Sequence, residues 1–480
     1  MRTIPYYLLI TTFMFFSLTL FSCDKTKTEK PNPPKEEEKE IDKKPDYKLE
    51  SITEEQKTKI LTFFTNSLSK NASQLNLSQN ISPDKIENFK KDVWNIWKEA
   101  NYNFSEEKLI QLSPLSEKKT SSWNIPSNLE PNAVLNYALG SKNGNSSTKF
   151  PLYVILHGSG DKHTEWSNMK LFCNSFNIGD AAYFIPQIPN TGGYYRWWQK
   201  GKQYVYEKLF RQAFISDSFN SNRFYFTGYS EGAYGSQRLA SFYADYIAGA
   251  APAAGGEPIE NAPAENCANI AFSLRTGSND DMFCRNGLTQ TAKDEFANLQ
   301  STYPQYYKNF IELIPGAGHG INYNPSLEYL KDFSRNPYPK FVNWEIYAMD
   351  GIVRSGFYNI LKPENLKKGD EGKRTNVKME ISGNTVKLTV SDVTVNVLER
   401  EPNWSLPIKS QKTYTPIPQG TIKLFLCQEL VDLTKPVIIT VNGKEVFNNK
   451  VEPSLESMVN SCATFFDPMR VYPAMVEVKW

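Results

Sequence analysis

The sequence predicts an α/β protein: a mostly parallel sheet with helices on both faces, preceded by a helical segment and followed by a small β-rich module. Three observations support this prediction. Buried-type hydrophobic runs alternate with helical runs between about residues 130 and 335, which is typical of a parallel sheet covered on both sides. Helical periodicity dominates before this region. Short β-rich runs with hairpin signals follow it.

Composition limits the classes of protein to consider. The chain has 480 residues, 40% hydrophobic and 13% aromatic, which is ample material for a packed core. The formal net charge of +2 comes from 54 basic and 52 acidic residues, so there is no electrostatic reason to expect nucleic acid as a partner. Three histidines and no CxxC motif argue against a zinc site, and we expect neither metal nor cofactor.

Residues 1–23 are predicted to be a signal peptide. The stretch "IPYYLLITTFMFFSLTLFSC" is apolar up to Cys23 and ends in "LFSC", which resembles a bacterial lipobox. That resemblance implies a lipid-modified thiol on Cys23 and acyl chains, such as palmitate, that anchor the protein in a membrane. An uncleaved signal anchor is the alternative. We therefore expect a bacterial cell-envelope lipoprotein that faces either the periplasm or the outside.

The segments before the sheet are a linker and a pair of helices. Residues 24–51 are rich in Lys, Glu and Pro and are predicted to form a disordered charged linker. Residues 52–125 are predicted to be an N-terminal helical segment, with an N-cap-like Thr53 before one helix and Pro83 at the first position of the next. No residue constellation in this segment suggests chemistry.

Residues 126–335 are predicted to form the sheet domain. The expected helices are 202–214, 231–246 and 288–303. The expected strands are 133–140, 150–158, 181–188, 223–228, 246–253, 269–277 and 310–316.

The last part of the chain is predicted to change to β-structure. Residues 336–364 are interpreted as an aromatic-rich connection packed on the sheet domain. Residues 365–480 are interpreted as a β-rich, sandwich-like module with hairpin turns at "SGNT" and "VNGKE".

Five cysteines remain beyond Cys23, an odd number for an exported protein. Bridges between Cys267 and Cys284 and between Cys427 and Cys462 are conceivable, and buried reduced thiols are the alternative.

A serine stands between two glycines in "RFYFTGYSEGAYGSQRL". A short buried-type strand precedes Ser230 and a helix follows it, so the turn between them must be tight and only small neighbours fit. Gly228 and Gly232 meet that steric need. Ser230 is therefore predicted to be a nucleophile exposed at the carboxyl edge of the sheet.

A glycine-rich loop, "HGSG", follows another strand. Attack on a carbonyl carbon places negative charge on its oxygen, which needs preorganised N–H donors. The expected donors of this oxyanion hole are the backbone amides of Glu231 and of Gly158 or Ser159. His157 is predicted to brace the loop rather than to act as a base.

A serine nucleophile needs a base, and the base needs a carboxylate. "GSND" and "GAGH" each follow a predicted strand and supply Asp280 and His319. Asp281 is the rival carboxylate. The predicted catalytic set is Ser230, Asp280 and His319, in that chain order.

"HGSG", "GYSEG", "GSND" and "GAGH" together resemble the motifs of the α/β-hydrolase superfamily over about residues 130–335. The resemblance is greatest to secreted esterases of the feruloyl esterase and polyhydroxybutyrate depolymerase type and to the catalytic domains of prolyl-oligopeptidase-type peptidases. It implies a metal-free serine hydrolase with an acyl-enzyme intermediate. Such peptidases usually carry a β-propeller. The tight turn around their nucleophile, called the nucleophile elbow, usually has a second glycine where this chain has Ala233. Both departures favour an esterase.

The stretch "IPNTGGYYRWWQ" follows a strand end, where loops build pockets in such folds. Stacking aromatic rings and one cation could bind an acyl group or a sugar, with ordinary packing as the alternative. The candidate pocket residues are Tyr194, Tyr195, Arg196, Trp197, Trp198 and Tyr229.

The sequence thus favours a serine esterase acting on carbohydrate-linked or small aromatic or aliphatic esters. A peptidase of the same mechanism is the first alternative. A non-catalytic lipoprotein that binds a glycan or protein through residues 365–480 is the second. The expected partners are a small-molecule or polysaccharide ester and a membrane reached through Cys23, with the oligomeric state left open.

Overall fold

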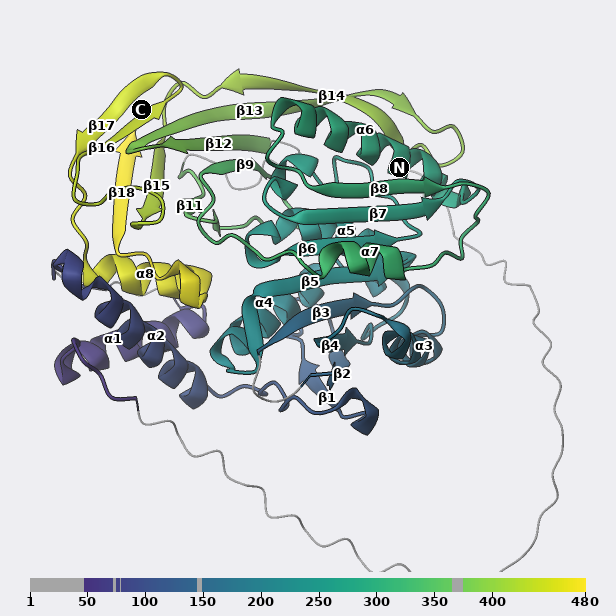
Figure 1. Ribbon diagram of the computed structural model, residues 1–480, viewed down its shortest axis with the longest axis horizontal. Coiled ribbons are helices and arrows are strands. Elements are labelled where there is room, and N and C mark those ends of the chain that lie inside the picture. The colour runs from purple at the N-terminus through teal and green to yellow at the C-terminus, as the bar shows by residue number, and fades with distance from the viewer. Residues whose placement is uncertain (1–46, 72–74, 78, 145–148, 365–373) are drawn as a thin grey trace, which may run out of the picture. The chain divides into compact units, whose positions relative to one another are not determined.

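The structure is a computed structural model, and it describes residues 47–480 apart from residues 72–74, 78, 145–148 and 365–373 (Figure 1). The predicted signal peptide with Cys23 and residues 24–46 of the predicted linker lie outside the described residues. None of the helices in the described residues has the length and apolar character needed to cross a membrane.

An eight-stranded sheet lies at the centre, in the order β1-β2-β4-β3-β5-β6-β7-β8. β1 and β2 are antiparallel to their neighbours, and β3 to β8 are parallel. The strands are β1 (Thr120–Asn124), β2 (Val134–Lys142), β3 (Phe150–Leu156), β4 (Ala181–Pro186), β5 (Phe219–Tyr229), β6 (Gly249–Ala253), β7 (Ala271–Gly277) and β8 (Asn309–Ile314). All seven predicted strands are present. β1 was not predicted, because its sequence "TSSWN" is polar and only its tryptophan is buried.

Helices cover both faces of this sheet. On one face, α3 (Lys162–Ser175) and α7 (Asn324–Leu330) pack on alternate strand residues such as Tyr153 and Tyr225. On the other, α4 (Lys200–Ile215), α5 (Glu231–Phe242) and α6 (Arg285–Thr302) pack on the intervening residues. The predicted α/β class is confirmed, and this strand order with helices on both faces is an α/β-hydrolase fold.

The N-terminal helices are α1 (Glu54–Leu68) and α2 (Ile86–Asn103). Thr53 caps α1 through a reciprocal pair of hydrogen bonds with Gln56. Helical structure ends at Asn103 apart from one short turn, and the last residues of the predicted segment 52–125 form β1. The helices pack against α8 (Leu455–Phe465) near the C-terminus (Figure 1), so the two ends of the described chain share one core.

The predicted β-rich C-terminal region is confirmed and consists of two sheets. The first has the order β17-β16-β13-β12-β9, with β14 also paired to β13. Its strands are β9 (Phe341–Ile346), β12 (Arg374–Ser382), β13 (Thr385–Arg400), β14 (Pro407–Pro416), β16 (Val437–Val441) and β17 (Lys444–Asn449). The second consists of β10 (Gly356–Phe357), β11 (Ile360–Leu361), β15 (Thr421–Leu426) and β18 (Ala474–Lys479). Strands β9, β10 and β11 come from the predicted connection 336–364.

All five cysteines in the described part of the chain are free, so the two conceivable disulfides are wrong. Cys267 precedes β7 and Cys284 follows it. A strand of that length spans roughly 20 Å, whereas a disulfide needs Cα atoms within about 7 Å. Cys427 and Cys462 are buried among apolar side chains, and burial raises the pKa of both thiols.

Candidate active site

Ser230 occupies the tight turn between β5 and α5 that the sequence predicts. Its backbone has φ 55° and ψ −114°, a strained conformation for a residue with a side chain. A Cβ added at Gly228 would lie 2.2 Å from the carbonyl oxygen of Gly232, and one added at Gly232 would lie 2.1 Å from that of Leu156. Both glycines are therefore required for the helix to approach β3 and β5 closely enough to form this turn.

The structure brings Ser230, His319 and Asp280 together in one hydrogen-bonded relay. His319 Nε2 lies 3.1 Å from Ser230 Oγ, and His319 Nδ1 lies 2.7 Å from Asp280 Oδ2. Asp280 is buried and Asp281 is exposed, so the geometry selects Asp280 of the two rival carboxylates. With Nδ1–H donating to the carboxylate, Nε2 can accept the proton of the serine hydroxyl.

The loops that carry Asp280 and His319 are joined by their backbones. A Cβ added at Gly277 would lie 2.1 Å from the carbonyl oxygen of Gly318. The N–H of Ser278 donates to Ile314 O at 2.9 Å, and the N–H of Asn279 donates to Ala317 O at 2.9 Å. The two loops are thus held at a fixed separation, which fixes the distance between the carboxylate and the imidazole.

His157 braces the loop between β3 and α3, as the sequence predicts. It is fully buried, its Nε2 accepts from the Ile188 N–H at 3.1 Å, and its Nδ1 lies 2.8 Å from Gly158 O. Burial lowers the pKa of His157 to about 4, so the ring is neutral near pH 7. A neutral ring with Nδ1–H donating to Gly158 and Nε2 accepting from Ile188 satisfies both contacts.

Residues predicted to form the oxyanion hole lie next to the serine. Glu231 is the first residue of α5, so its N–H has no acceptor within the helix. A Cβ added at Gly158 would lie 3.5 Å from the Cβ of Ser230, so the loop of Gly158 and Ser159 runs directly beside the nucleophile. A helix N-terminus facing a glycine-rich loop provides backbone N–H groups for a developing negative charge.

The side chain of Glu231 places a carboxyl group within this site. It is 8% exposed, and its Oε2 lies 3.3 Å from Arg196 Nη1. Oε1 has no hydrogen-bond partner among the described residues. Burial raises the pKa of Glu231 to about 7, opposed in part by Arg196. Near neutral pH the carboxyl group is therefore protonated in a substantial fraction of molecules.

The candidate pocket residues divide into two groups. Tyr195 and Trp197 do not line a pocket, because both are buried beneath the Gly158 loop: Tyr195 donates to Gly158 O at 2.9 Å, and Trp197 Nε1 donates to His157 O at 2.9 Å. The prediction was wrong for these two, since alternate side chains of this aromatic run point inward.

The remaining candidates keep accessible surface. Tyr194 and Arg196 are exposed, and Trp198 is half-buried against the Arg238 guanidinium, 4.1 Å from its ring centroid. Tyr229 lies directly before the nucleophile, with its ring centroid 5.1 Å from that of His319. Of this group, Tyr229 is therefore in contact with the relay, and Arg196 reaches the site through Glu231.

Sequence reasoning missed Arg285. Its Nη1 donates to Asp280 Oδ1 at 3.0 Å and lies 3.4 Å from His319 Nδ1, and its Nε donates to the Tyr234 hydroxyl at 2.7 Å. Arg285 opens α6, where the helix dipole disfavours a cation. Burial is not visible in the sequence, and Arg285 lies before the predicted helix 288–303, so the sequence carried no signal for this role.

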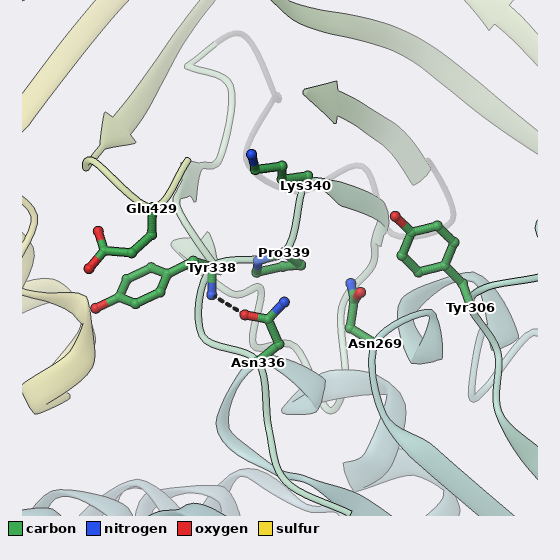
Figure 2. A pocket seen from close by; sticks show the side chains of 7 residues that line it. All are labelled: Asn269, Tyr306, Asn336, Tyr338, Pro339, Lys340 and Glu429. Atoms are coloured by element: carbon green, nitrogen blue, oxygen red, sulfur yellow. Dashed lines mark hydrogen bonds between the residues drawn. The ribbon is translucent and has the colours of Figure 1, made fainter. Parts of the chain in front are cut away.

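A cavity of about 490 Å³ lies elsewhere (Figure 2). Its lining includes Asn269, Tyr306 and Lys340, which precede β7, β8 and β9. These are the amino ends of the strands, whereas Ser230, Asp280 and His319 follow carboxyl ends. The cavity is therefore separate from the relay. Among the residues that the structure describes, no group of three or more His, Cys, Asp or Glu side chains is arranged to hold a metal ion.

Comparison with known proteins adds only general similarity. No family model and no curated protein matches the chain. Among solved structures, a thermostable esterase is 17% identical with a TM-score of 0.34, covering 46% of this chain and 64% of its own. A ferulic acid esterase from Anaeromyces mucronatus is 16% identical with a TM-score of 0.33, covering 45% and 90%. An S-formylglutathione hydrolase from Staphylococcus aureus is 16% identical with a TM-score of 0.31, covering 45% and 95%. At these values the similarity bears on the fold alone.

Proposed function

We propose that the protein is a serine hydrolase that cleaves carboxylic esters, with Ser230 as nucleophile, His319 as base and Asp280 as the carboxylate that orients the base. The observation that carries this proposal is the relay from Ser230 Oγ to His319 Nε2 at 3.1 Å and from His319 Nδ1 to Asp280 Oδ2 at 2.7 Å. The strained Ser230 backbone and its two close-packed glycines support the same role, because strain of this kind is maintained at functional sites.

The chemistry follows from the positions of these atoms. Ser230 Oγ attacks the ester carbonyl carbon while its proton passes to His319 Nε2, and the carbonyl oxygen becomes an oxyanion. Backbone N–H groups of Glu231 and of Gly158 or Ser159 stabilise that charge. The C–O bond to the alcohol then breaks, and His319 protonates the leaving alkoxide. Water, deprotonated by the same histidine, releases the acid from the acyl-enzyme and restores Ser230.

Asp280 acts through the imidazole. Its Oδ2 accepts from Nδ1–H and so fixes both the tautomer and the orientation of His319. Arg285 donates to the other carboxylate oxygen and holds Asp280 in that orientation. Ser230 is 6% exposed, so an ester must bring its carbonyl group down to the serine between the surrounding loops. The proposed substrates are esters of carbohydrates or of small aromatic or aliphatic acids.

The test compares the protein with its Ser230→Ala variant on short-chain p-nitrophenyl esters. We expect the variant to lose on the order of 10⁴-fold or more in kcat, since the triad acts as a unit. Equal rates for the two proteins would contradict the proposal. Faster Ser230-dependent cleavage of aminoacyl-p-nitroanilides than of esters would contradict the esterase assignment while leaving the serine mechanism in place.

We also propose, from the sequence, that the protein is an envelope lipoprotein anchored through Cys23. Expression in a bacterium fed radiolabelled palmitate should give a labelled, membrane-associated protein. The Cys23→Ser variant should be unlabelled, and equal labelling of both forms would contradict the anchor.

A further inference from the structure

A hairpin of the C-terminal region reaches the loop that follows Asp280. β13 and β14 are long strands that run past β12, and β14 packs against α6 (Figure 1). The turn between them, residues 401–406, carries Trp404. The ring centroid of Trp404 lies 4.5 Å from that of Phe283. Trp404, more than a hundred residues further along the chain, thus contacts the loop that follows Asp280.

Phe283 is separated from the relay by one side chain. The Arg285 guanidinium lies 5.3 Å from the centroid of the Phe283 ring. The same guanidinium donates to Asp280 Oδ1 at 3.0 Å and lies 3.4 Å from His319 Nδ1. The aromatic pair is therefore close to the relay.

The hairpin is fixed in this position by polar contacts along its second strand. Thr291 Oγ1 of α6 donates to Ile408 O at 2.9 Å. Lys412 Nζ lies 2.6 Å from Glu265 Oε1 and 2.7 Å from Glu345 Oε2, and all three side chains are at most 8% exposed. Within the turn, the Trp404 N–H donates to Glu401 Oε2 at 2.6 Å. Trp404 therefore lies on a hairpin whose position is fixed by hydrogen bonds and ion pairs.

The pair also has large exposed apolar surface. Trp404 is 42% exposed, Phe283 is 36% exposed and the neighbouring Met282 is 55% exposed. Phe283 and Cys284 both have left-handed backbones, with φ of 56° and 55°. An exposed aromatic ring on a left-handed backbone, as at Phe283, is unfavourable for stability alone. We call Phe283 and Trp404 the aromatic platform.

We propose that the aromatic platform binds the sugar part of a carbohydrate ester while Ser230 attacks its acyl group. This inference rests on the proposed function. An open platform covers only one face of a ligand, so it suits a ligand with one apolar face. A pyranose ring stacks its C–H face on an aromatic ring and keeps its hydroxyl groups in water or on polar neighbours such as Glu401 and Asn403. An acyl chain would instead need to be enclosed to gain from burial.

The first experiment measures kcat/KM for an O-acetylated xylo-oligosaccharide and for p-nitrophenyl acetate, which share the acyl group. We expect Trp404→Ala to lower the ratio of the two values about tenfold, mainly through KM for the sugar ester. Trp404→Phe should restore most of the ratio because it keeps a ring. Met475→Ala removes an apolar side chain of similar exposure on β18 and should leave the ratio unchanged.

The second experiment measures binding without catalysis. Xylohexaose, cellohexaose and mannohexaose are titrated against the Ser230→Ala protein and against the same protein carrying Trp404→Ala. We expect at least one hexasaccharide to bind, with affinity reduced about tenfold by the second substitution. Circular dichroism and thermal melting of each variant show whether the fold is retained.

The outcomes separate the two proposals. Loss of sugar binding on Trp404→Ala supports the platform even if the protein hydrolyses no ester, in which case the proposed function fails alone. Ser230-dependent hydrolysis with an unchanged ratio in Trp404→Ala overturns the platform alone. Failure of all three hexasaccharides to bind the Ser230→Ala protein also overturns the platform.

Discussion

Glu231 follows Ser230 directly, and burial holds the pKa of its carboxyl group at about 7, against an ordinary value of 4.5. Below the ordinary value the group is protonated in the folded and the unfolded protein alike. As pH rises from there to about 7, the Glu231 carboxyl group ionises in the unfolded chain but stays largely protonated in the folded protein. The free energy of unfolding therefore falls over this range. Above about pH 7 the free energy of unfolding is lower than at acidic pH by about 3 kcal/mol.

Replacement of this carboxyl group should therefore stabilise the protein in a pH-dependent way. We expect Glu231→Gln to raise the melting temperature by a few degrees at about pH 8 and much less at about pH 5, because only the ionised carboxylate is penalised. Melting followed by circular dichroism at both pH values checks this. Asp281→Asn removes an exposed carboxyl group and serves as control. A gain of equal size at both pH values would contradict the assignment.

Arg285 lies beside both the carboxylate and the imidazole, so it should position the relay. We expect Arg285→Gln to lower kcat for p-nitrophenyl esters about tenfold, because Asp280 loses the donor that holds its second carboxylate oxygen. Arg285→Lys keeps a cationic donor and should restore part of kcat. An unchanged kcat in Arg285→Gln, or no recovery in Arg285→Lys, would contradict this role.

The sequence predicted the residue types of the relay but not how side chains point. Ser230, Asp280 and His319 follow strand ends, and parallel strands bring their carboxyl ends to one edge, so their proximity could be predicted. The choice between Asp280 and Asp281 depended on the direction of each side chain, which the sequence does not show. The same holds for Trp197, which lies in a promising loop but points into the core.

At the scale of single elements, the elbow between β5 and α5 depends on close backbone approach. A Cβ at position 232 would overlap the carbonyl oxygen of Leu156, a backbone atom that cannot move without shifting β3. We expect Gly232→Ala to abolish hydrolysis of p-nitrophenyl esters and to lower stability by about 1–3 kcal/mol. Gly193→Ala is the matched control, since a Cβ there meets nothing within 4 Å. Similar activity in both variants would contradict this account of the turn.

Elements with strong apolar periodicity were predictable, and those formed by tertiary packing were not. β3 and β4 are buried along their whole length and were readily predicted. α3 was missed because it buries only Met169 and Cys173. α8 was missed within a region of strands, and its apolar face becomes understandable only once α1 and α2 are seen to cover it.

At the scale of the whole molecule, the described residues pack as one compact unit. A buried charge network joins segments around the eight-stranded sheet to the chain's last segments. Arg335 Nη1 lies 2.6 Å from Asp467 Oδ2, which lies 2.7 Å from Arg470 Nε. Arg470 and Arg354 both contact Asp245, at 2.6 and 2.9 Å. Ion pairs from Asp245, which follows α5, and from Arg335, which follows α7, therefore join these parts of the chain to the C-terminal segment.

This network predicts that the eight-stranded sheet with its helices and the C-terminal region unfold together. Removal of one partner from a buried charge network leaves the others unpaired, at a cost of about 3–5 kcal/mol. We expect Asp467→Ala to shift a single calorimetric transition to lower temperature and to reduce ester hydrolysis in parallel at elevated temperature. Lys435→Ala, which breaks an exposed ion pair with Asp432, should have little effect. Two separate transitions in the unmodified protein would contradict this coupling.

The predicted domain boundary at residue 365 falls within one sheet of the C-terminal region. Strand β9 precedes that position, yet it pairs with β12 along six registered residue pairs. Composition marks where alternating strands and helices give way to strands alone. It does not mark which strands pair, because pairing depends on long-range contacts that a local pattern does not contain.

The claim that His319 and Asp280 activate Ser230 is tested most directly by labelling with a fluorophosphonate probe, followed by mass spectrometry of the modified peptide. We expect one label per chain on Ser230. His319→Ala should slow labelling by on the order of 10³-fold or more, since the neutral hydroxyl then lacks its base. Labelling at another residue, or an equal rate in the His319→Ala variant, would contradict the relay as the source of reactivity.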